Sequence, residues 1–239
     1  GRFTPPGTRI SLWPLGVLLG SGPALHSVME AAQAMHQFSD EGSDPWIAAG
    51  VELAEFGQAG RDLVTFLWPS ELHGMHTGTK QLFEESLGKD NKGVTLASEA
   101  PAIEDLVAAE RSRGVFVHVR MEGAVDEHAS YVQAAKARGY QVIELVLPAV
   151  PVMTPLLTPE GERVARVSAA FYGVQKIVAS LAWVWDINFV TQSGVEGYKV
   201  AMAAATGEAP LQQLLERLAP EHHLEWNGLH IALDGLLPF

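Results

Sequence analysis

The stretch Pro14-Leu-Gly-Val-Leu-Leu-Gly-Ser-Gly-Pro23 carries the strongest indication of the fold. Its apolar part predicts a buried strand at 17–19, its glycines predict a turn at 20–22, and a helix is expected to follow at 24–37. Such a turn directs free backbone N–H groups and the positive end of a helix dipole toward a phosphate or carboxylate. Ser21 and Gly22 are therefore candidate substrate-binding residues. The turn lacks the third glycine of the dinucleotide-binding fingerprint and the Gly-Lys-Ser/Thr ending of a P-loop.

The composition restricts the classes of function. The chain has 239 residues, no cysteine and a formal net charge of −12. This negative charge argues against a nucleic-acid-binding protein, which needs clustered Lys and Arg. The absence of cysteine excludes disulfides, thiolate metal sites and a cysteine nucleophile, and it suits a cytoplasmic protein. No apolar run reaches the roughly 18 residues that a membrane span needs, so no membrane partner is expected.

Strand and helix signals alternate along the chain. Strands are expected at 17–19, 62–68, 94–97, 115–119 and 141–147, and helices at 24–37, 46–56, 79–87, 102–111, 126–138 and 162–185. The alternation predicts an α/β fold with a doubly wound, mainly parallel five-stranded sheet that is flanked by helices. We expect an N-terminal arm at 1–13, the α/β domain at 14–204, and a C-terminal helical extension at 205–239 that packs on the domain or on a partner subunit. Ligands of such sheets bind at the carboxyl ends of the strands.

A loop is expected at 70–78, between the second expected strand and the next helix, and it is the main candidate site. His73 lies in it and is a candidate proton shuttle near neutral pH. Hydroxyl-bearing and small residues of the segment form the expected phosphate cradle at a helix start: Ser70, Thr77, Gly78 and Thr79. The alternative is that Thr77 only caps the helix and that His73 and His76 are surface loop residues. The two histidines lack a third ligand, so no metal is expected, and no cofactor is expected either.

Two further sets of residues have the spacing of catalytic groups. Glu30, Glu52 and Glu55 lie on expected helices, where one carboxylate could act as a general base; the alternative is a solvated helix face. Tyr172 and Lys176 share one helix face, as the catalytic pair of short-chain dehydrogenases does. The alternative is a core aromatic beside a lysine, because the nucleotide fingerprint is missing.

The order of these segments resembles the SIS, or sugar isomerase, domain over about residues 14–200. The resemblance rests on Leu19-Gly-Ser-Gly-Pro23, Asp62-Leu-Val-Thr-Phe-Leu67, Gly114-Val-Phe-Val-His-Val119, Tyr131-Val-Gln-Ala-Ala-Lys-Ala-Arg-Gly-Tyr140 and Ala170-Phe-Tyr-Gly-Val-Gln-Lys176. It implies a doubly wound fold that binds a small-molecule sugar phosphate and forms a homodimer or a higher homo-oligomer. It also implies that Lys199, in the loop after the last long helix, reaches the substrate oxygen.

The chain departs from the family pattern at two places. The Ser-x-Ser-Gly-x-Thr phosphate loop of SIS domains corresponds here to Arg120-Met-Glu-Gly123. The Glu-Leu-Lys-His-Gly segment of glucosamine-6-phosphate synthase-like members corresponds to Glu52-Leu-Ala-Glu-Phe-Gly57, where Glu55 stands in place of the histidine.

Three functions remain open. The first is a phosphosugar-binding protein that could also be an aldose–ketose isomerase, with Glu52, His73 and Lys199 as catalytic residues. The second is a non-catalytic SIS-like module that binds a ligand or dimerises. The third is an NAD(P)-dependent short-chain reductase that uses Tyr172 and Lys176.

Overall fold

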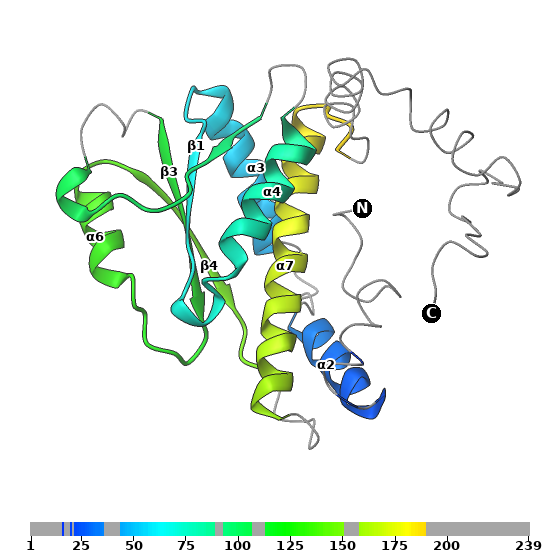
Figure 1. The fold of residues 1–239 in the computed structure, drawn as a ribbon. Coiled ribbons are helices and arrows are strands. Elements are labelled where there is room, and N and C mark those ends of the chain that lie inside the picture. The colour runs from blue at the N-terminus through cyan, green and yellow to red at the C-terminus, as the bar shows by residue number, and fades with distance from the viewer. Residues whose placement is uncertain are drawn as a thin grey trace, which may run out of the picture. The chain divides into compact units, whose positions relative to one another are not determined.

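The computed structural model describes residues 16, 20, 22–35, 44–88, 93–106, 113–150 and 158–189. In these residues, four parallel strands form one sheet with helices on both of its faces (Figure 1). The strands are β1 (Leu63–Leu67), β2 (Thr95–Leu96), β3 (Gly114–Met121) and β4 (Gln141–Leu147). Their order across the sheet is β2-β1-β3-β4. The expected α/β class with a parallel sheet is confirmed.

The helices alternate with the strands along the chain. The described α-helices are α2 (Gly22–Ala34), α3 (Pro45–Gln58), α4 (Met75–Leu87), α6 (Ala129–Ala137) and α7 (Pro159–Val184), and two short 3-10 helices are η1 (Ser70–Leu72) and η2 (Ile103–Asp105). Asp44 caps α3 by accepting a hydrogen bond from the Trp46 N–H, and Thr158 caps α7 by accepting one from the Gly161 N–H. Both helices carry a proline at the first position, where its missing N–H costs nothing.

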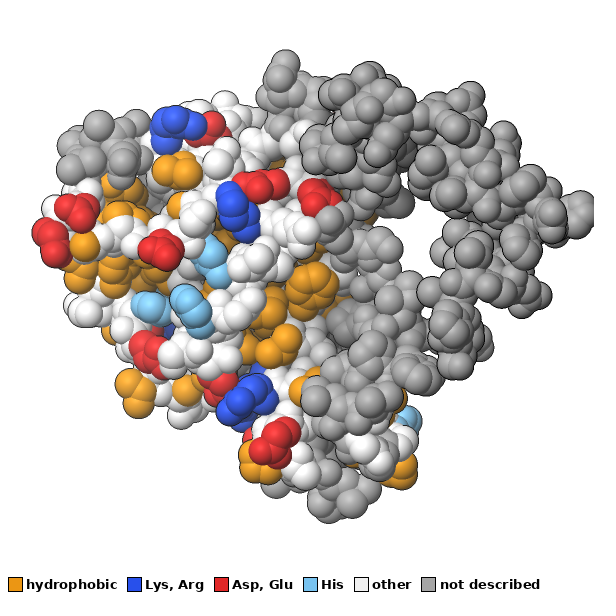
Figure 2. Space-filling view, in the orientation of Figure 1, with side chains coloured by type: hydrophobic (Ala, Val, Ile, Leu, Met, Phe, Trp, Pro, Cys, Tyr) orange, Lys and Arg blue, Asp and Glu red, His pale blue; other side chains and the backbone are white. Residues whose placement is uncertain are grey.

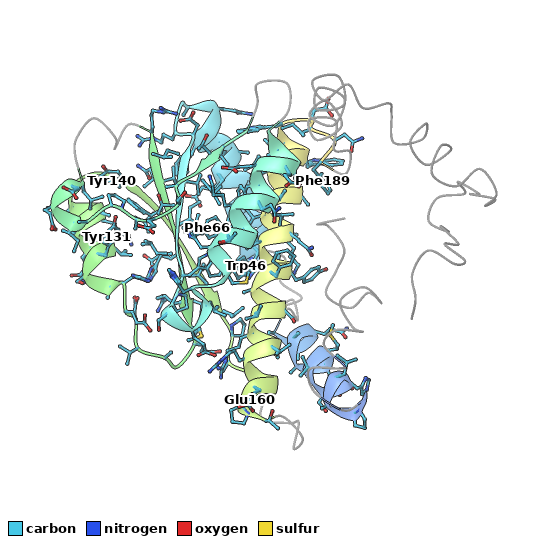
Figure 3. All side chains as sticks on the ribbon, viewed as in Figure 1. Trp46, Phe66, Tyr131, Tyr140, Glu160 and Phe189 are labelled. Carbon is cyan, nitrogen blue, oxygen red and sulfur yellow. The ribbon has the colours of Figure 1, made fainter. Side chains whose placement is uncertain are left out.

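One face of the sheet carries the main core. Alternate strand residues point to this face, because side chains of a strand alternate with a period of two. They include Val64 and Phe66 of β1, Val117 and Val119 of β3, and Leu145 and Leu147 of β4. Helices α3, α4 and α7 cover them, and Figure 3 shows Trp46 of α3 close to α7.

The opposite face carries a smaller core under α6. Leu67 and Phe116 of the sheet pack there on Val132 of α6 and on Tyr140. The centre of the Phe116 ring lies 5.3 Å from that of Tyr140 and 5.4 Å from that of Tyr131. Burial raises the pKa of Tyr131 to about 12, with a smaller contribution from Tyr140.

Helix α7 is the central helix of the main core. Small side chains along it, including Ala165, Ala169 and Gly173, let α2, α3 and α4 approach closely. Among the described helices, α7 alone has the length and hydropathy of a membrane span, and 67% of that apolar window is buried inside the protein. Burial of this extent is what the core helix of an α/β unit requires.

Several expected elements differ from the structure or lie outside the described residues. The expected loop at 70–78 is wrong, because η1 and the first turn of α4 occupy most of it. Leu72 and Met75 are both buried, and helical turns place both side chains on the core. Of the helix expected at 102–111, only η2 is seen, and residues 107–112 lie outside the described part.

The strand expected at 17–19 also lies outside the described residues. The two glycines that flank it are described, and the Gly20 N–H donates to the Gly16 carbonyl oxygen at 3.0 Å. The sheet of the described residues has four strands and not the expected five. The chain forms two compact units, Gly1–Gln192 and Ser193–Phe239. All residues of the second unit lie outside the described residues. The arm at 1–13, the domain end at 204 and the extension at 205–239 stay predictions.

Candidate functional site at the carboxyl edge of the sheet

The carboxyl ends of β1 and β3 define the candidate site. The chain leaves β1 toward η1 and α4, which lie on the main-core face, and it leaves β3 toward α6 on the opposite face (Figure 1). Neighbouring parallel strands whose connections diverge leave a crevice at their carboxyl edge, where ligands of such sheets bind. The segments that follow Leu67 and Met121 therefore meet at the edge where a ligand is expected.

Three consecutive residues tie the connection between β3 and α6 to this edge, and we call Asp126, Glu127 and His128 the clasp. Asp126 Oδ1 lies 3.0 Å from Nε2 of His118, a residue of β3. The same oxygen accepts a hydrogen bond from the backbone N–H of His128. The His128 Nε2–H donates to the carbonyl oxygen of Trp68, which follows β1, at 2.9 Å. Asp126 thus binds β3, and His128 binds the residue that follows β1.

Glu127, the middle residue of the clasp, is an exposed carboxylate that Ser70 binds. The Ser70 hydroxyl donates to Oε1 of Glu127 at 2.7 Å, and the Ser70 backbone N–H donates to Oε2 at 3.1 Å. These two hydrogen bonds lower the pKa of Glu127, so its carboxyl group is ionised at neutral pH. The hydroxyl and N–H of Ser70 therefore act together as a pair of donors for one anionic group.

His118 is the buried member of this network. The residue is only 1% exposed, its Nε2–H donates to Asp126, and its Nδ1 has no hydrogen-bond partner among the described residues. Burial lowers the pKa of His118, and the opposing effect of Asp126 does not overcome it. The neutral imidazole is therefore the favoured form in the folded protein.

Acidification is expected to destabilise the protein through His118. An unfolded histidine has a pKa near 6.5, above that of folded His118, so the unfolded state binds more protons in the interval between the two values. The contribution of neutral His118 is present above pH 6.5 and is lost as the pH falls toward the folded pKa, with a slope of at most about 1.4 kcal/mol per pH unit. Urea denaturation from pH 7.5 to 5 should show a shallower loss for His118→Gln. The exposed His26→Gln is the matched control, and equal slopes for all three proteins would contradict the prediction.

A pocket of about 510 Å³ opens beside Ser70, and we call it the edge pocket. Its lining joins η1 to the first turns of α7: Ser70, Glu71, Pro159, Glu162, Arg163 and Arg166. Arg166 forms ion pairs with Glu71 and Glu162. Arg163 is exposed and forms no ion pair within the described residues. The pocket therefore offers one guanidinium to an anion and two carboxylates that can accept hydrogen bonds from hydroxyl groups.

Two of the predicted site residues lie at this edge with accessible side chains. Ser70 lines the edge pocket, and His73 is exposed at the end of η1. Figure 2 shows histidine side chains grouped on one face of the molecule, close to carboxylates. His76 is half-buried, and its Nε2 lies 3.0 Å from the carbonyl oxygen of Ala97, so its ring is engaged at the end of β2.

The predicted phosphate cradle is wrong at Thr79. Helix α4 begins at Met75, so Thr77, Gly78 and Thr79 lie within it and not in a loop. Thr79 is fully buried, and its hydroxyl cannot reach a ligand. Gly78 faces Phe171 of α7, whereas Thr77 stays exposed in the first turn of α4. Among the three, only the Thr77 hydroxyl is available to bind an anion at the helix N-terminus.

Glu52 lies far from the edge pocket. It follows Gly50 on α3, and Gly50 contacts Ile177 and Ser180 in the second half of α7. Arg166 of the pocket precedes Ile177 by three helical turns, a rise of about 16 Å. Partial burial raises the pKa of Glu52, and nearby Glu55 adds to the effect. The structure therefore does not bring Glu52 and His73 together as an acid–base pair.

The remaining predicted residues belong to other parts of the chain. Gly22 is the first residue of α2. Ser21 and Lys199 lie outside the described residues, so their expected contacts with substrate stay predictions.

Tyr172 and Lys176 are arranged as structural residues. The Lys176 Nζ lies 4.7 Å from the centre of the Tyr172 ring, and it forms an ion pair with Asp44 at 2.6 Å. A lysine that lowers the pKa of a catalytic tyrosine acts on the phenolic oxygen, whereas this one lies over the ring face. The geometry favours the interpretation that Tyr172 is an aromatic residue packed against a lysine.

Sequence reasoning missed the clasp and the arginines of the edge pocket. The signal that could have found the clasp is the run Asp126-Glu-His128 in the connection that follows a strand ending at the predicted ligand edge. The described residues contain no group of three His, Cys, Asp or Glu side chains that could hold a metal ion. A scan against protein-family models finds no match for this chain, and no curated protein is similar to it at a significant level.

Proposed function

We propose that this chain binds a phosphorylated sugar in the edge pocket. The observation that carries the proposal is the donor pair of Ser70, which already holds a carboxylate with its N–H and its hydroxyl. A phosphate oxygen accepts hydrogen bonds of the same kind, and its charge strengthens them. The resemblance to SIS domains supports the same class of ligand.

The lining of the edge pocket suits the rest of such a ligand. Arg163 can pair with a phosphate group, because it has no carboxylate partner among the described residues. Glu71 and Glu162 expose carboxylate oxygens that can accept hydrogen bonds from sugar hydroxyls. A volume of about 510 Å³ falls within the range of pockets for small molecules.

The separation of Glu52 from the edge pocket favours binding without isomerisation. An aldose–ketose isomerase needs a base within hydrogen-bond reach of the proton that it moves. Glu52 lies several helical turns from the pocket along α7, so it is not within reach of a ligand bound beside Ser70. We therefore favour the non-catalytic SIS-like module over the isomerase.

Ligand binding by the purified chain tests this function. Titration calorimetry with hexose, pentose and amino-sugar phosphates should give saturable heat, whereas the corresponding free sugars should give none. Arg163→Ala is expected to weaken binding by roughly tenfold or more, because a hydrogen bond to a charged group contributes about 1.5–3 kcal/mol. Arg138→Ala removes an exposed arginine at the C-terminal cap of α6 and should leave the affinity unchanged.

Two outcomes of this experiment would count against the proposal. Absence of heat with every sugar phosphate would exclude phosphosugar binding. Equal affinities of wild type and Arg163→Ala would place the ligand outside the edge pocket. A turnover assay on the sugar phosphates that bind distinguishes the isomerase from the non-catalytic SIS-like module. Saturable binding with isomerisation would support the isomerase.

A further inference from the structure

We propose that the clasp is an internal gate on the edge pocket, in which the Glu127 carboxylate occupies the Ser70 donors until an external anion replaces it. The inference rests on the proposed function, because Ser70, which Glu127 holds, also lines the edge pocket. It adds a step to binding, namely the release of Glu127 from Ser70.

The Ser70 contacts make the two anions mutually exclusive. Both donors that Ser70 offers at the carboxyl edge, its hydroxyl and its backbone N–H, are used by Glu127 in this structure. A phosphate oxygen at the same donors would lie within a few ångströms of the Glu127 carboxylate, and like charges at that distance repel. An external anion therefore reaches Ser70 only when Glu127 has moved away.

The Glu127 side chain can leave Ser70 without disturbing the core. Residues 122–125 between β3 and the clasp are exposed, and Val125 is 88% exposed. Gly123 has a φ of 76°, and a Cβ at this position would meet no atom of the described residues within 4 Å, so the chain at Gly123 is open to solvent. Release of Glu127 breaks two solvent-exposed hydrogen bonds and buries nothing new.

The neighbours of Glu127 restore the closed state. Asp126 is bound to buried His118, and His128 is bound to the carbonyl of Trp68, so the residues on both sides hold Glu127 opposite Ser70. A side chain held in this way competes with an external ligand at a high effective concentration. The apparent dissociation constant of the ligand is then increased by the reciprocal of the open fraction.

The test compares Glu127→Ala with a matched loss of charge. Glu122→Ala removes a carboxylate from the same connection, and Glu122 accepts a hydrogen bond from Ala149 and not from Ser70. Binding of inorganic phosphate to the full chain is followed by calorimetry and by the chemical shift of the Ser70 amide. If the open fraction is about one tenth, Glu127→Ala should bind phosphate about tenfold more tightly than wild type, and Glu122→Ala should differ from wild type by less than twofold.

A double variant shows whether the tighter phosphate binding of Glu127→Ala depends on the Ser70 hydroxyl. Adding Ser70→Ala to Glu127→Ala should remove most of the tenfold gain, because the hydroxyl that Glu127 had blocked is then missing. In the absence of phosphate, the Ser70 amide should exchange its hydrogen faster in Glu127→Ala than in wild type, because its acceptor is gone.

Each result bears on the gate or on the proposed function. Tighter phosphate binding by Glu127→Ala alone supports the gate. Equal binding by wild type, Glu127→Ala and Glu122→Ala overturns the gate and leaves phosphosugar binding standing. Equal gains for both single variants indicate a general charge effect and also overturn the gate. Failure of every variant to bind phosphate overturns the gate together with the anion-binding function.

Discussion

Gly50→Ala is expected to lower the free energy of unfolding by about 3 kcal/mol, at the upper end of overpacking effects. A Cβ at this position would lie 2.4 Å from the carbonyl oxygen of Ile177 and 2.0 Å from Oγ of Ser180. The serine can rotate away, but the carbonyl belongs to the backbone of α7 and cannot. Helices α3 and α7 would have to separate, which loosens the centre of the main core. The higher helix propensity of alanine, about 1 kcal/mol, offsets only part of this loss.

Gly78→Ala is the matched control for this substitution. Gly78 also lies inside a helix, but a Cβ there would meet Phe171 at 3.7 Å, an ordinary van der Waals distance. This variant should be unchanged or more stable by up to about 1 kcal/mol. Thermal unfolding distinguishes the two, since 1 kcal/mol corresponds to about 2–4 °C in a domain of this size. A melting temperature of Gly50→Ala equal to that of wild type would show that α3 and α7 do not pack at this glycine.

The strands and helices of the sheet were predictable from local patterns. The run Leu63–Leu67 is apolar and ends at Pro69, and the run Gly114–Met121 is rich in valine, so both were expected as strands of a parallel sheet. Helix α7 shows apolar residues at helical spacing over its whole length. The region 70–78 was predicted wrongly as a loop, because its threonine and glycine residues favour turns. Burial of Leu72 and Met75 outweighs that local preference.

The candidate site was predictable only in part. Ser70 could be found because it follows a strand at the expected ligand edge. Its partner Glu127 could not, since the two residues lie 57 positions apart and meet only through the order of the strands. Arg163 reaches the pocket because α7 returns to the same edge, a path that spacing alone does not reveal.

Residue spacing also suggested a pairing that the folded chain uses differently. Tyr172 and Lys176 do lie on one face of α7, as predicted. The third partner, Asp44, decides their role, because it draws the lysine into an ion pair at the start of α3. A motif of two residues therefore predicts proximity correctly and chemistry poorly. The membership in the SIS family, the homo-oligomer and the cytoplasmic location stay predictions.

Lys176→Met is expected to lower the free energy of unfolding by about 3 kcal/mol. The side chains of Lys176 and Asp44 are only 9% and 6% exposed, and their charged atoms lie 2.6 Å apart. Methionine can fill much of the volume of the lysine stem, but it leaves the Asp44 carboxylate buried without its cation. Removal of one partner of a buried pair costs more than the pair contributes, because the remaining charge is poorly solvated.

A double-mutant cycle separates this effect from the loss of packing. Asp44→Asn keeps an oxygen that can accept the Trp46 N–H at the start of α3, so the helix cap survives. The double variant Asp44→Asn/Lys176→Met has no unpaired charge and should be more stable than Lys176→Met alone, with a coupling free energy of about 2 kcal/mol. Raising the salt concentration should change this coupling little, since buried pairs are weakly screened. Additive effects of the two substitutions would mean that Asp44 and Lys176 are solvated in solution, and α3 would then be anchored to α7 by its apolar contacts alone.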